Sequence, residues 1–516
     1  MRVLIAAAAL LVAFPVHAYN EALHGLLTQR ALEAHGEWRS QTLQPPTAAD
    51  LAALRALFWK TASKVEDPSL KKYFLKRFPT AASLDAWGFK EFLMLDPAAT
   101  VHGLDLTADD GKPMNRVELL ALASRWPDDD ARNRNRFFRD GKREVALASD
   151  GTNMPYDPMT LALGKLQGGT SQGHAHYGLS SVPYSDDPEV LKKDPRHFAI
   201  PPDIRAFGQD VAQLYSDLSL LAAGAGLPSS QWLSVVHAGA SFHHLEDVAN
   251  QIHTVQVGIY DFFEAAYLQS TMRDVATLGG LFGPRRSLRE VGLRLVANHH
   301  LLLEDLFARR VQEAAAGKAV SPEIKAAVEG ITKDDPAFAP AVAQAIKLAG
   351  ERPEAGPFAR TLCDALVESS SVEAPEIYQL AWAFSAKTLH DGAGHEYKSP
   401  PDDPDQFLAP ETPERAARLR RFWELEGRGL TRAGTVLRAW QAEHDKAAPE
   451  AEDLREHIVR RMLAQLLPYH LAAAERRAKY VPAGPDEQHV ALGYPLAALA
   501  LLVLIAFVVL RIRRKV

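Results

Sequence analysis

The chain carries one stretch, Phe242-His243-His244-Leu245-Glu246-Asp247-Val248-Ala249-Asn250-Gln251-Ile252-His253, in which imidazoles and carboxylates are crowded together. This stretch belongs to a longer segment that opens at Ser229-Ser230, immediately after Pro228. Serine is a preferred residue at the start of a helix. Apolar residues then recur at helical spacing, at Leu233, Val236, Ala240 and Leu245. A capping residue followed by this period predicts a helix that carries the histidines.

On such a helix, His243 and Asp247 lie four residues apart, so their side chains project from one face. Together they can bind one metal ion, because zinc accepts combinations of imidazole and carboxylate ligands. His253 follows at the end of the run, where it could bind a second ion nearby. The same spacing also suits a hydrogen bond on a solvated helix surface. The metal hypothesis therefore depends on further ligands elsewhere in the chain.

A later segment offers a second pair with the same spacing. It begins with the capping-box pattern Ser287-Leu288-Arg289-Glu290 and runs to Arg309-Arg310 as an amphipathic helix. Near its middle, His300 and Glu304 again place an imidazole and a carboxylate four residues apart. The pair is flanked by Leu301, Leu302, Leu303 and Leu306. Because an unpaired charge is costly near an apolar core, metal binding explains this pair better than a solvated surface does.

The composition favours an all-α fold and narrows the possible chemistry. The 516 residues are rich in Ala and Leu and contain few alternating β-branched runs. Cys363 is the one cysteine, which excludes a disulfide framework and most thiolate metal sites, so a zinc site must use nitrogen and oxygen ligands. The net charge of −6 argues against a protein that coats nucleic acid, although not against a nuclease.

The amino-terminal end predicts export. Residues 1–18 combine a basic start, an apolar run and the small-residue cleavage site Val16-His17-Ala18, as is typical of a secretory signal peptide. Cleavage after Ala18 would make Tyr19 the mature amino terminus.

The carboxyl-terminal end predicts a membrane anchor. Val490 to Leu510 is an apolar run of 21 residues, long enough to cross a bilayer. The basic tail at 511–516 would stay in the cytoplasm and leave the body outside, in a bacterial periplasm or at the cell surface. The alternative is a buried core helix, whereas a lipid-anchor signal would end in apolar residues. A Pro- and Gly-containing linker at 481–486 precedes the run.

Three other places hold candidate ligands with ordinary alternative interpretations. His24 lies in the expected helix that opens the mature chain, where it could simply be exposed. Asp128 follows Trp126-Pro127, in a cluster that also suits a turn with a helix cap. His174 and His176 lie in a glycine-rich loop at 168–178, where both could be solvated.

Taken in order, these residues resemble the zinc-dependent phospholipase C and single-strand-specific zinc nuclease superfamily. The order is a terminal aromatic, a histidine, Trp-x-Asp, His-aromatic, His-x-x-x-Asp with a further histidine six residues on, and His-x-x-x-Glu. The spacing from Tyr19 to His24 matches that from the terminal tryptophan to the first histidine in the nuclease branch. The resemblance covers roughly residues 19 to 307 and implies an all-helical fold that holds three zinc ions.

Carried over by position, the resemblance implies three groups of ligands. One zinc would be held by Asp128, His176, His243 and Asp247. A second would be held by Tyr19, through its free amine and carbonyl, and by His24, with Asp247 bridging to the first. The third would be held by His253, His300 and Glu304. His176 is preferred to His174 because Tyr177 matches the aromatic after the family ligand, and His243 is preferred to His244 because it lies four residues before Asp247.

The grouped ions imply a hydrolytic mechanism without a covalent enzyme intermediate. Two zinc ions that share a carboxylate can share a water and lower its pKa to near neutrality. The third can neutralise charge that develops on a phosphodiester in the transition state. In the family, the residue at Asp128 is the candidate for orienting or deprotonating the water.

The chain departs from the family pattern at several points. Tyr19 replaces the usual tryptophan, and Gln251 stands where a proline usually precedes the last histidine of the central motif. The gaps between Asp128 and His176 and between His253 and His300 are longer than in the small secreted enzymes. The second gap holds aromatic and glycine-rich runs at 257–264 and 278–283, which suit either a lipid-touching lid or extra core packing.

The expected organisation has five parts. A signal peptide at 1–18 precedes a zinc phospholipase C-like catalytic domain at 19–400. Residues 401–489 form a helical extension and linker, in which 412–478 reads as two or three charged amphipathic helices, for example Glu414 to Leu425 and Glu452 to Leu467. A transmembrane helix at 490–510 and a basic cytoplasmic tail at 511–516 complete the chain.

The sequence thus predicts an exported, membrane-anchored zinc phosphodiesterase of the phospholipase C type, with phospholipid or another phosphodiester as substrate. The predicted membrane anchor favours a lipid substrate, because it keeps the site beside the bilayer. A single-strand-specific nuclease of the same fold, acting on nucleic acid, is the first alternative. The second is a non-catalytic helical membrane protein in which zinc is structural.

Overall fold

The computed structural model of this chain describes residues 21–83, 114–125, 127, 178, 188–193, 208–254, 306–351, 358–389 and 412–465. Its α-helices are α2 (Glu21–Ala31), α3 (Ala48–Ala62), α4 (Pro68–Arg77), α7 (Arg116–Arg125), α12 (Pro188–Lys193), α13 (Gly208–Ala223), α14 (Ser230–Ala249), α18 (Pro322–Gly330), α19 (Ala339–Gly350), α20 (Phe358–Leu389) and α22 (Pro413–Ala447). Short 3-10 helices are η1 (Gly36–Ser40), η6 (Gln251–His253) and η7 (Ala448–Glu450). Residues 306–315 and 455–465 are also helical.

The described residues contain no β-strand, and their one β feature is an isolated antiparallel bridge between Thr42 and Asn115. The predicted all-α class is therefore confirmed at this level. None of the described helices is both long enough and apolar enough to span a bilayer. The predicted span at 490–510, the signal peptide at 1–18 and the linker at 481–486 lie outside the described residues.

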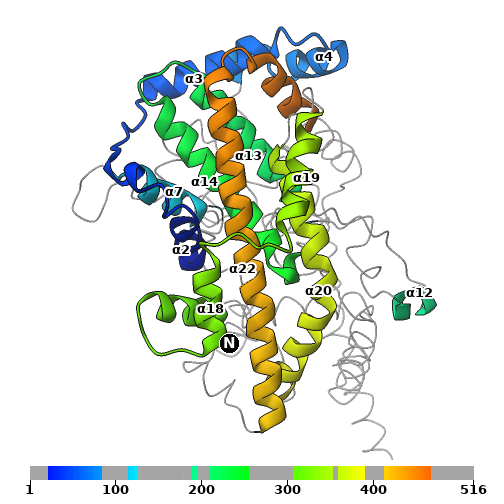
Figure 1. Cartoon of the computed structure of the whole chain (residues 1–516). Coiled ribbons are helices and arrows are strands. Elements are labelled where there is room, and N and C mark those ends of the chain that lie inside the picture. The colour runs from blue at the N-terminus through cyan, green and yellow to red at the C-terminus, as the bar shows by residue number, and fades with distance from the viewer. Residues whose placement is uncertain are drawn as a thin grey trace, which may run out of the picture.

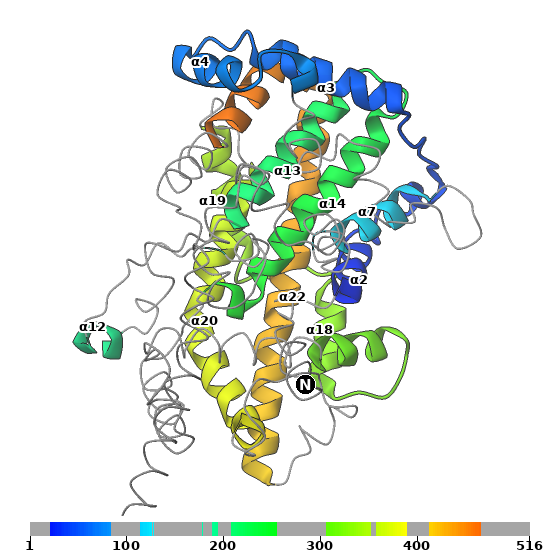
Figure 2. The same ribbon diagram turned by 180° about the vertical axis from the view of Figure 1, so that it is seen from behind.

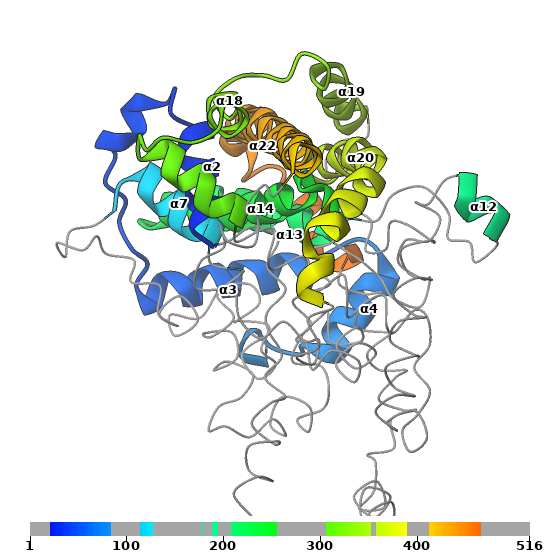
Figure 3. The ribbon, with the colours of Figure 1, turned by 90° about the horizontal axis from the view of Figure 1, so that it is seen from below.

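The core is a helix bundle built around α14. The long helix α22 runs along the body of the molecule, with α14 and α20 beside it (Figure 1). From behind, α13 and α14 lie in front of α22, and α7 and α2 pack at one side of α14 (Figure 2). Seen from below, α13 and α14 lie side by side next to α20 and α22 (Figure 3). Helices thus cover α14 on several sides.

The predicted helix at the central stretch is confirmed as α14, which begins at Ser230. Ser229 occupies the cap position but makes no side-chain capping bond; instead the Ser230 hydroxyl accepts a hydrogen bond from the Leu227 amide at 2.9 Å. Every residue from Trp232 to Asn250 is buried. A helix buried all round is normally apolar, so the polar side chains on α14 must find partners inside the bundle.

Serine hydroxyls join α14 to α13. The Ser241 hydroxyl donates to the Ala212 carbonyl at 2.7 Å, and the Ser219 hydroxyl donates to the Ser234 carbonyl at 2.8 Å. The hairpin between the two helices passes through Gly226, whose positive φ of 67° favours glycine. These contacts fix the position of α14 along its axis and therefore determine which residues of the neighbouring helices its histidines face.

A close approach between α14 and α7 makes Gly239 necessary. A Cβ at Gly239 would lie 2.5 Å from the Ala123 Cβ and 2.7 Å from the Leu120 carbonyl oxygen, so the two helices would have to separate. Gly239→Ala should therefore lower the free energy of unfolding by about 1–3 kcal/mol, measured by urea denaturation, despite the better helix propensity of alanine. In the matched change Gly350→Ala, at an open position of α19, stability should hold or rise. A stabilised Gly239→Ala variant would contradict this packing.

The helix predicted from Glu414 to Leu425 is longer than expected, because it forms one part of the 35-residue α22. Three glycines at 427, 429 and 434 lower the helix propensity beyond Leu425. Tertiary packing offsets this cost: a Cβ at Gly434 would lie 2.2 Å from the Ile331 carbonyl oxygen, so the small residue lets α22 approach the end of α18. The helix expected from Glu452 begins at residue 455, after a run of turns.

Candidate metal centre

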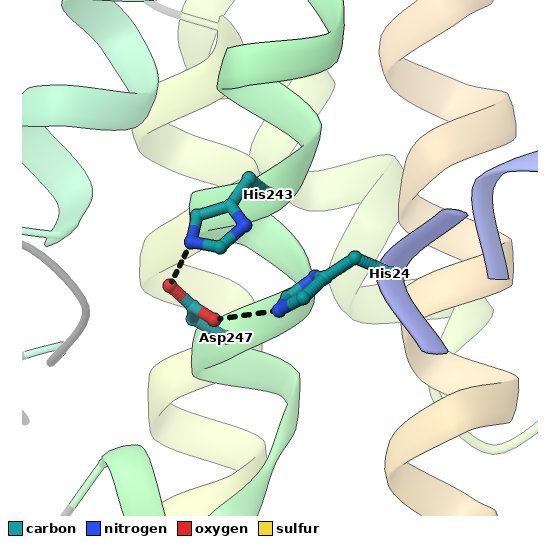
Figure 4. A group of neighbouring side chains, drawn as sticks. All are labelled: His24, His243 and Asp247. Atoms are coloured by element: carbon teal, nitrogen blue, oxygen red, sulfur yellow. Dashed lines mark ion pairs between the residues drawn. The ribbon is translucent and has the colours of Figure 1, made fainter. Parts of the chain in front are cut away.

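Two helices bring three of the predicted ligands together. His243 and Asp247 lie one turn apart on α14, and His24 reaches them from α2 (Figure 4). The three side chains are fully buried, and their ligand atoms all lie within 4.8 Å of one another. This group could hold a metal ion. The His24 and His243 rings lie against each other with centroids 4.2 Å apart.

The carboxylate of Asp247 faces one imidazole with each oxygen. Its Oδ1 lies 3.4 Å from His24 Nε2, and its Oδ2 lies 3.2 Å from His243 Nε2. Zinc–nitrogen and zinc–oxygen bonds of about 2 Å at a tetrahedral angle place two ligand atoms about 3.3 Å apart. Both separations therefore fit edges of a metal coordination polyhedron, with Asp247 able to bridge two positions.

The far side of the His243 ring is fixed by the backbone of α7. Nδ1 lies 2.7 Å from the carbonyl oxygen of Ser124, and a carbonyl can only accept, so Nδ1 carries the hydrogen. In the neutral ring, Nε2 then presents a lone pair to Asp247 Oδ2. Two acceptors at 3.2 Å repel unless a cation lies between them or the ring takes a second proton. The anchored tautomer is the one that metal binding through Nε2 requires.

The far side of the His24 ring is held by a carboxylate. Nδ1 lies 2.6 Å from Glu246 Oε2, and the hydroxyl of Thr28, one turn further along α2, donates to Glu246 Oε1 at 2.7 Å. Burial raises the pKa of Glu246 to about 7, although the hydrogen bonds from His24 and Thr28 lower it. When Glu246 is ionised, Nδ1 of His24 carries the hydrogen and Nε2 presents its lone pair to Asp247.

The charges in this group also favour a cation. Glu246 and Asp247 are consecutive, fully buried carboxylates, and Asp247 raises the cost of ionising Glu246. When both carboxylates are ionised and both imidazoles are neutral, the four side chains carry a charge of −2 in a fully buried place, which is costly unless a cation compensates it. The donor set of nitrogen and oxygen atoms therefore fits a divalent ion such as zinc.

Of the other predicted ligands, His253 alone lies within the described residues, and it is not part of this group. His253 is fully buried in η6, just beyond the end of α14, and its carbonyl accepts a hydrogen bond from the Gly178 amide at 2.9 Å. Tyr19, Asp128, His176, His300 and Glu304 lie outside the described residues, as do the alternative His174 and the runs at 257–264 and 278–283.

His243 lies nearer than His244 to the Asp247 carboxylate. Nδ1 of His244 lies 3.8 Å from Asp247 Oδ2, further than Nε2 of His243, and the His244 ring stacks on Tyr215 with centroids 5.8 Å apart. Gln251, where the family has proline, donates to the Leu425 carbonyl at 2.7 Å and to Glu373 at 2.9 Å. This side chain therefore ties the turn before His253 to α22 and α20.

Sequence reasoning missed Glu246 and the backbone of Ser124 as parts of the site. Glu246 lies in the quoted stretch directly before a predicted ligand, which was a usable signal. Thr28, four residues after His24 on the same helix face, was a second one. The carbonyl of Ser124 left no signal, because every residue has one.

A scan against protein-family models and searches of curated proteins and of solved structures found no match to this chain. The class that the described fold and site define is an all-helical protein with a buried imidazole–carboxylate group that could hold a metal ion.

Proposed function

We propose that this protein is a zinc-dependent phosphodiester hydrolase, exported and anchored to a membrane, that resembles phospholipase C. The observation that carries the proposal is the carboxylate of Asp247, held between the Nε2 atoms of His24 and His243 in a fully buried site. Both rings make a hydrogen bond through Nδ1, so Nε2 is the atom through which each would bind a metal. Ligands from two helices far apart in sequence are hard to explain by packing alone.

Contacts next to two other predicted ligands add support. Ser124, four residues before Asp128, already reaches His243, and Gly178, two residues after His176, bonds to the backbone of His253. In the proposed centre, His243 and Asp247 would hold one ion with Asp128 and His176, and Tyr19 and His24 would hold a second. His253, His300 and Glu304 would hold a third.

When bound, zinc would supply Lewis acidity toward the phosphodiester and lower the pKa of a water molecule. The chain's own residues supply the geometry. The Ser124 carbonyl and Glu246 keep both imidazoles in the tautomer that presents Nε2. Asp128 is assigned the role of orienting the attacking water. The buried position strengthens electrostatic interactions at the site.

The substrate class can be tested directly with purified full-length protein in detergent. We expect hydrolysis of phosphatidylcholine that a chelator removes and zinc restores. Chelator-sensitive cleavage of single-stranded DNA instead would favour the nuclease. Elemental analysis separates the non-catalytic alternative: two or three zinc ions per chain agree with the proposal, and well under two, with neither activity, contradict it.

His243→Ala should remove hydrolytic activity with only a modest loss of stability, because the ring contributes a ligand and one hydrogen bond to the Ser124 carbonyl. Turnover and far-UV circular dichroism measure the two effects. His237→Ala is the matched control, since it removes another fully buried imidazole, six residues before His243 on α14. The control should keep zinc and turnover. Retained turnover in His243→Ala would refute the assigned role.

A further inference from the structure

Glu246 links the metal group to α2 through two contacts on one helix face. His24 Nδ1 lies 2.6 Å from one carboxylate oxygen, and the Thr28 hydroxyl donates to the other at 2.7 Å. All three side chains are fully buried. Thr28 thus fixes the rotation of the carboxylate, and the carboxylate fixes the rotation of the His24 ring. Glu246 therefore fixes the orientation of the His24 ring, as the Ser124 carbonyl fixes that of the His243 ring.

We propose that Glu246 is a positioning residue for the metal centre: it holds His24 with Nε2 toward Asp247 and contributes negative charge that raises zinc affinity. The inference rests on the proposed zinc site. A carboxylate that accepts from the outer ring nitrogen of a ligating histidine fixes its tautomer and increases its basicity. Glu246 itself lies behind the ring and does not contact the metal position.

The geometry makes a specific prediction about the order of variants. Glu246→Gln keeps an acceptor oxygen for Nδ1 but removes the charge, whereas Glu246→Ala removes both. Zinc affinity should therefore fall by up to about tenfold in Glu246→Gln and by about 10- to 100-fold in Glu246→Ala. Thr28→Val keeps Glu246 and removes only its hydroxyl donor, and should weaken binding a few-fold.

The measurement is competition for zinc against a chromophoric chelator, with full-length protein whose folding is checked by circular dichroism. The visible spectrum of the cobalt-substituted protein gives a second readout, because it reports ligand geometry and a merely structural role would not change it. Glu426→Gln is the matched control, because Glu426 is a buried glutamate on α22 whose pKa is raised by burial and by Glu373 rather than by the metal group.

The outcomes separate this role from the proposed function. Folded Glu246→Ala and Thr28→Val variants with wild-type zinc affinity and an unchanged cobalt spectrum would overturn the positioning role alone. If Glu246→Ala does not fold, Glu246→Gln and Thr28→Val decide the question. Failure of the wild-type protein to bind zinc would overturn both proposals. Zinc binding that weakens in the predicted order, without phosphodiester hydrolysis by the wild type, would overturn only the enzymatic function.

Discussion

Asp247→Asn should lose zinc and hydrolysis together, with turnover reduced on the order of 1000-fold. Among the described residues, Asp247 is the carboxylate that faces both imidazoles, so its loss would remove a ligand from each of the two proposed metal positions. A loss of several kcal/mol of transition-state stabilisation corresponds to a rate effect of this size. Zinc content by elemental analysis and turnover on phosphatidylcholine measure the two effects.

The same variant should remain folded without metal. Asp247 and Glu246 are buried carboxylates at consecutive positions, and replacing one by a neutral amide relieves their repulsion. Zinc should raise the Tm of the wild type and leave that of Asp247→Asn unchanged, because only a native state that binds the ion gains stability from it. Asp453→Asn, at an exposed position, is the control and should behave as wild type. Full zinc stabilisation of Asp247→Asn would rule out Asp247 as a ligand.

Glu426→Gln should change the pH dependence of stability more than any surface substitution. Burial, with a further contribution from Glu373, raises the pKa of Glu426 from 4.5 to about 8. Within the described residues, neither carboxyl oxygen of Glu426 has a hydrogen-bond partner. The folded state therefore keeps this group protonated at pH values where the unfolded chain is ionised.

The sign follows from proton linkage. Between pH 4.5 and about 8 the folded state binds the extra proton, so the wild type loses stability as the pH rises through this window. The loss approaches about 1 kcal/mol per pH unit, and Glu426→Gln should lack it. Urea unfolding in the presence of a chelator at pH 5, 6.5 and 8 measures the difference. Glu424→Gln, exposed on the same helix, should keep the wild-type slope. Parallel slopes for Glu426→Gln and wild type would contradict a buried, protonated Glu426.

The central helix was predictable because its signals are local. A serine at the start and apolar residues at helical spacing are properties of consecutive residues, and α14 begins at Ser230, as they predict. The full length of α22 was not predictable in this way. Gly427 and Gly434 are tolerated because Ala327 of α18 and Ile331 at its end pack closely against them, and that contact joins segments about a hundred residues apart.

The candidate site was predictable only where its residues lie close together in the sequence. The spacing of His243 and Asp247 is local to one helix, whereas the addition of His24 depended on the resemblance to the zinc enzymes. The structure places His24 beside Asp247. The hydrogen-bond partners of the two imidazole rings could not be predicted from residue spacing. Ser124 contacts His243 through its backbone carbonyl, and Glu246 contacts His24, a residue more than two hundred positions away.

The most direct test of the metal centre is anomalous scattering at the zinc absorption edge from crystals of the zinc-loaded protein. Peaks should lie about 2 Å from His24 Nε2, from His243 Nε2 and from the two oxygens of Asp247. Zinc-replete crystals in which these atoms hold only hydrogen bonds, with no peak between the two imidazoles and the carboxylate, would contradict the assignment.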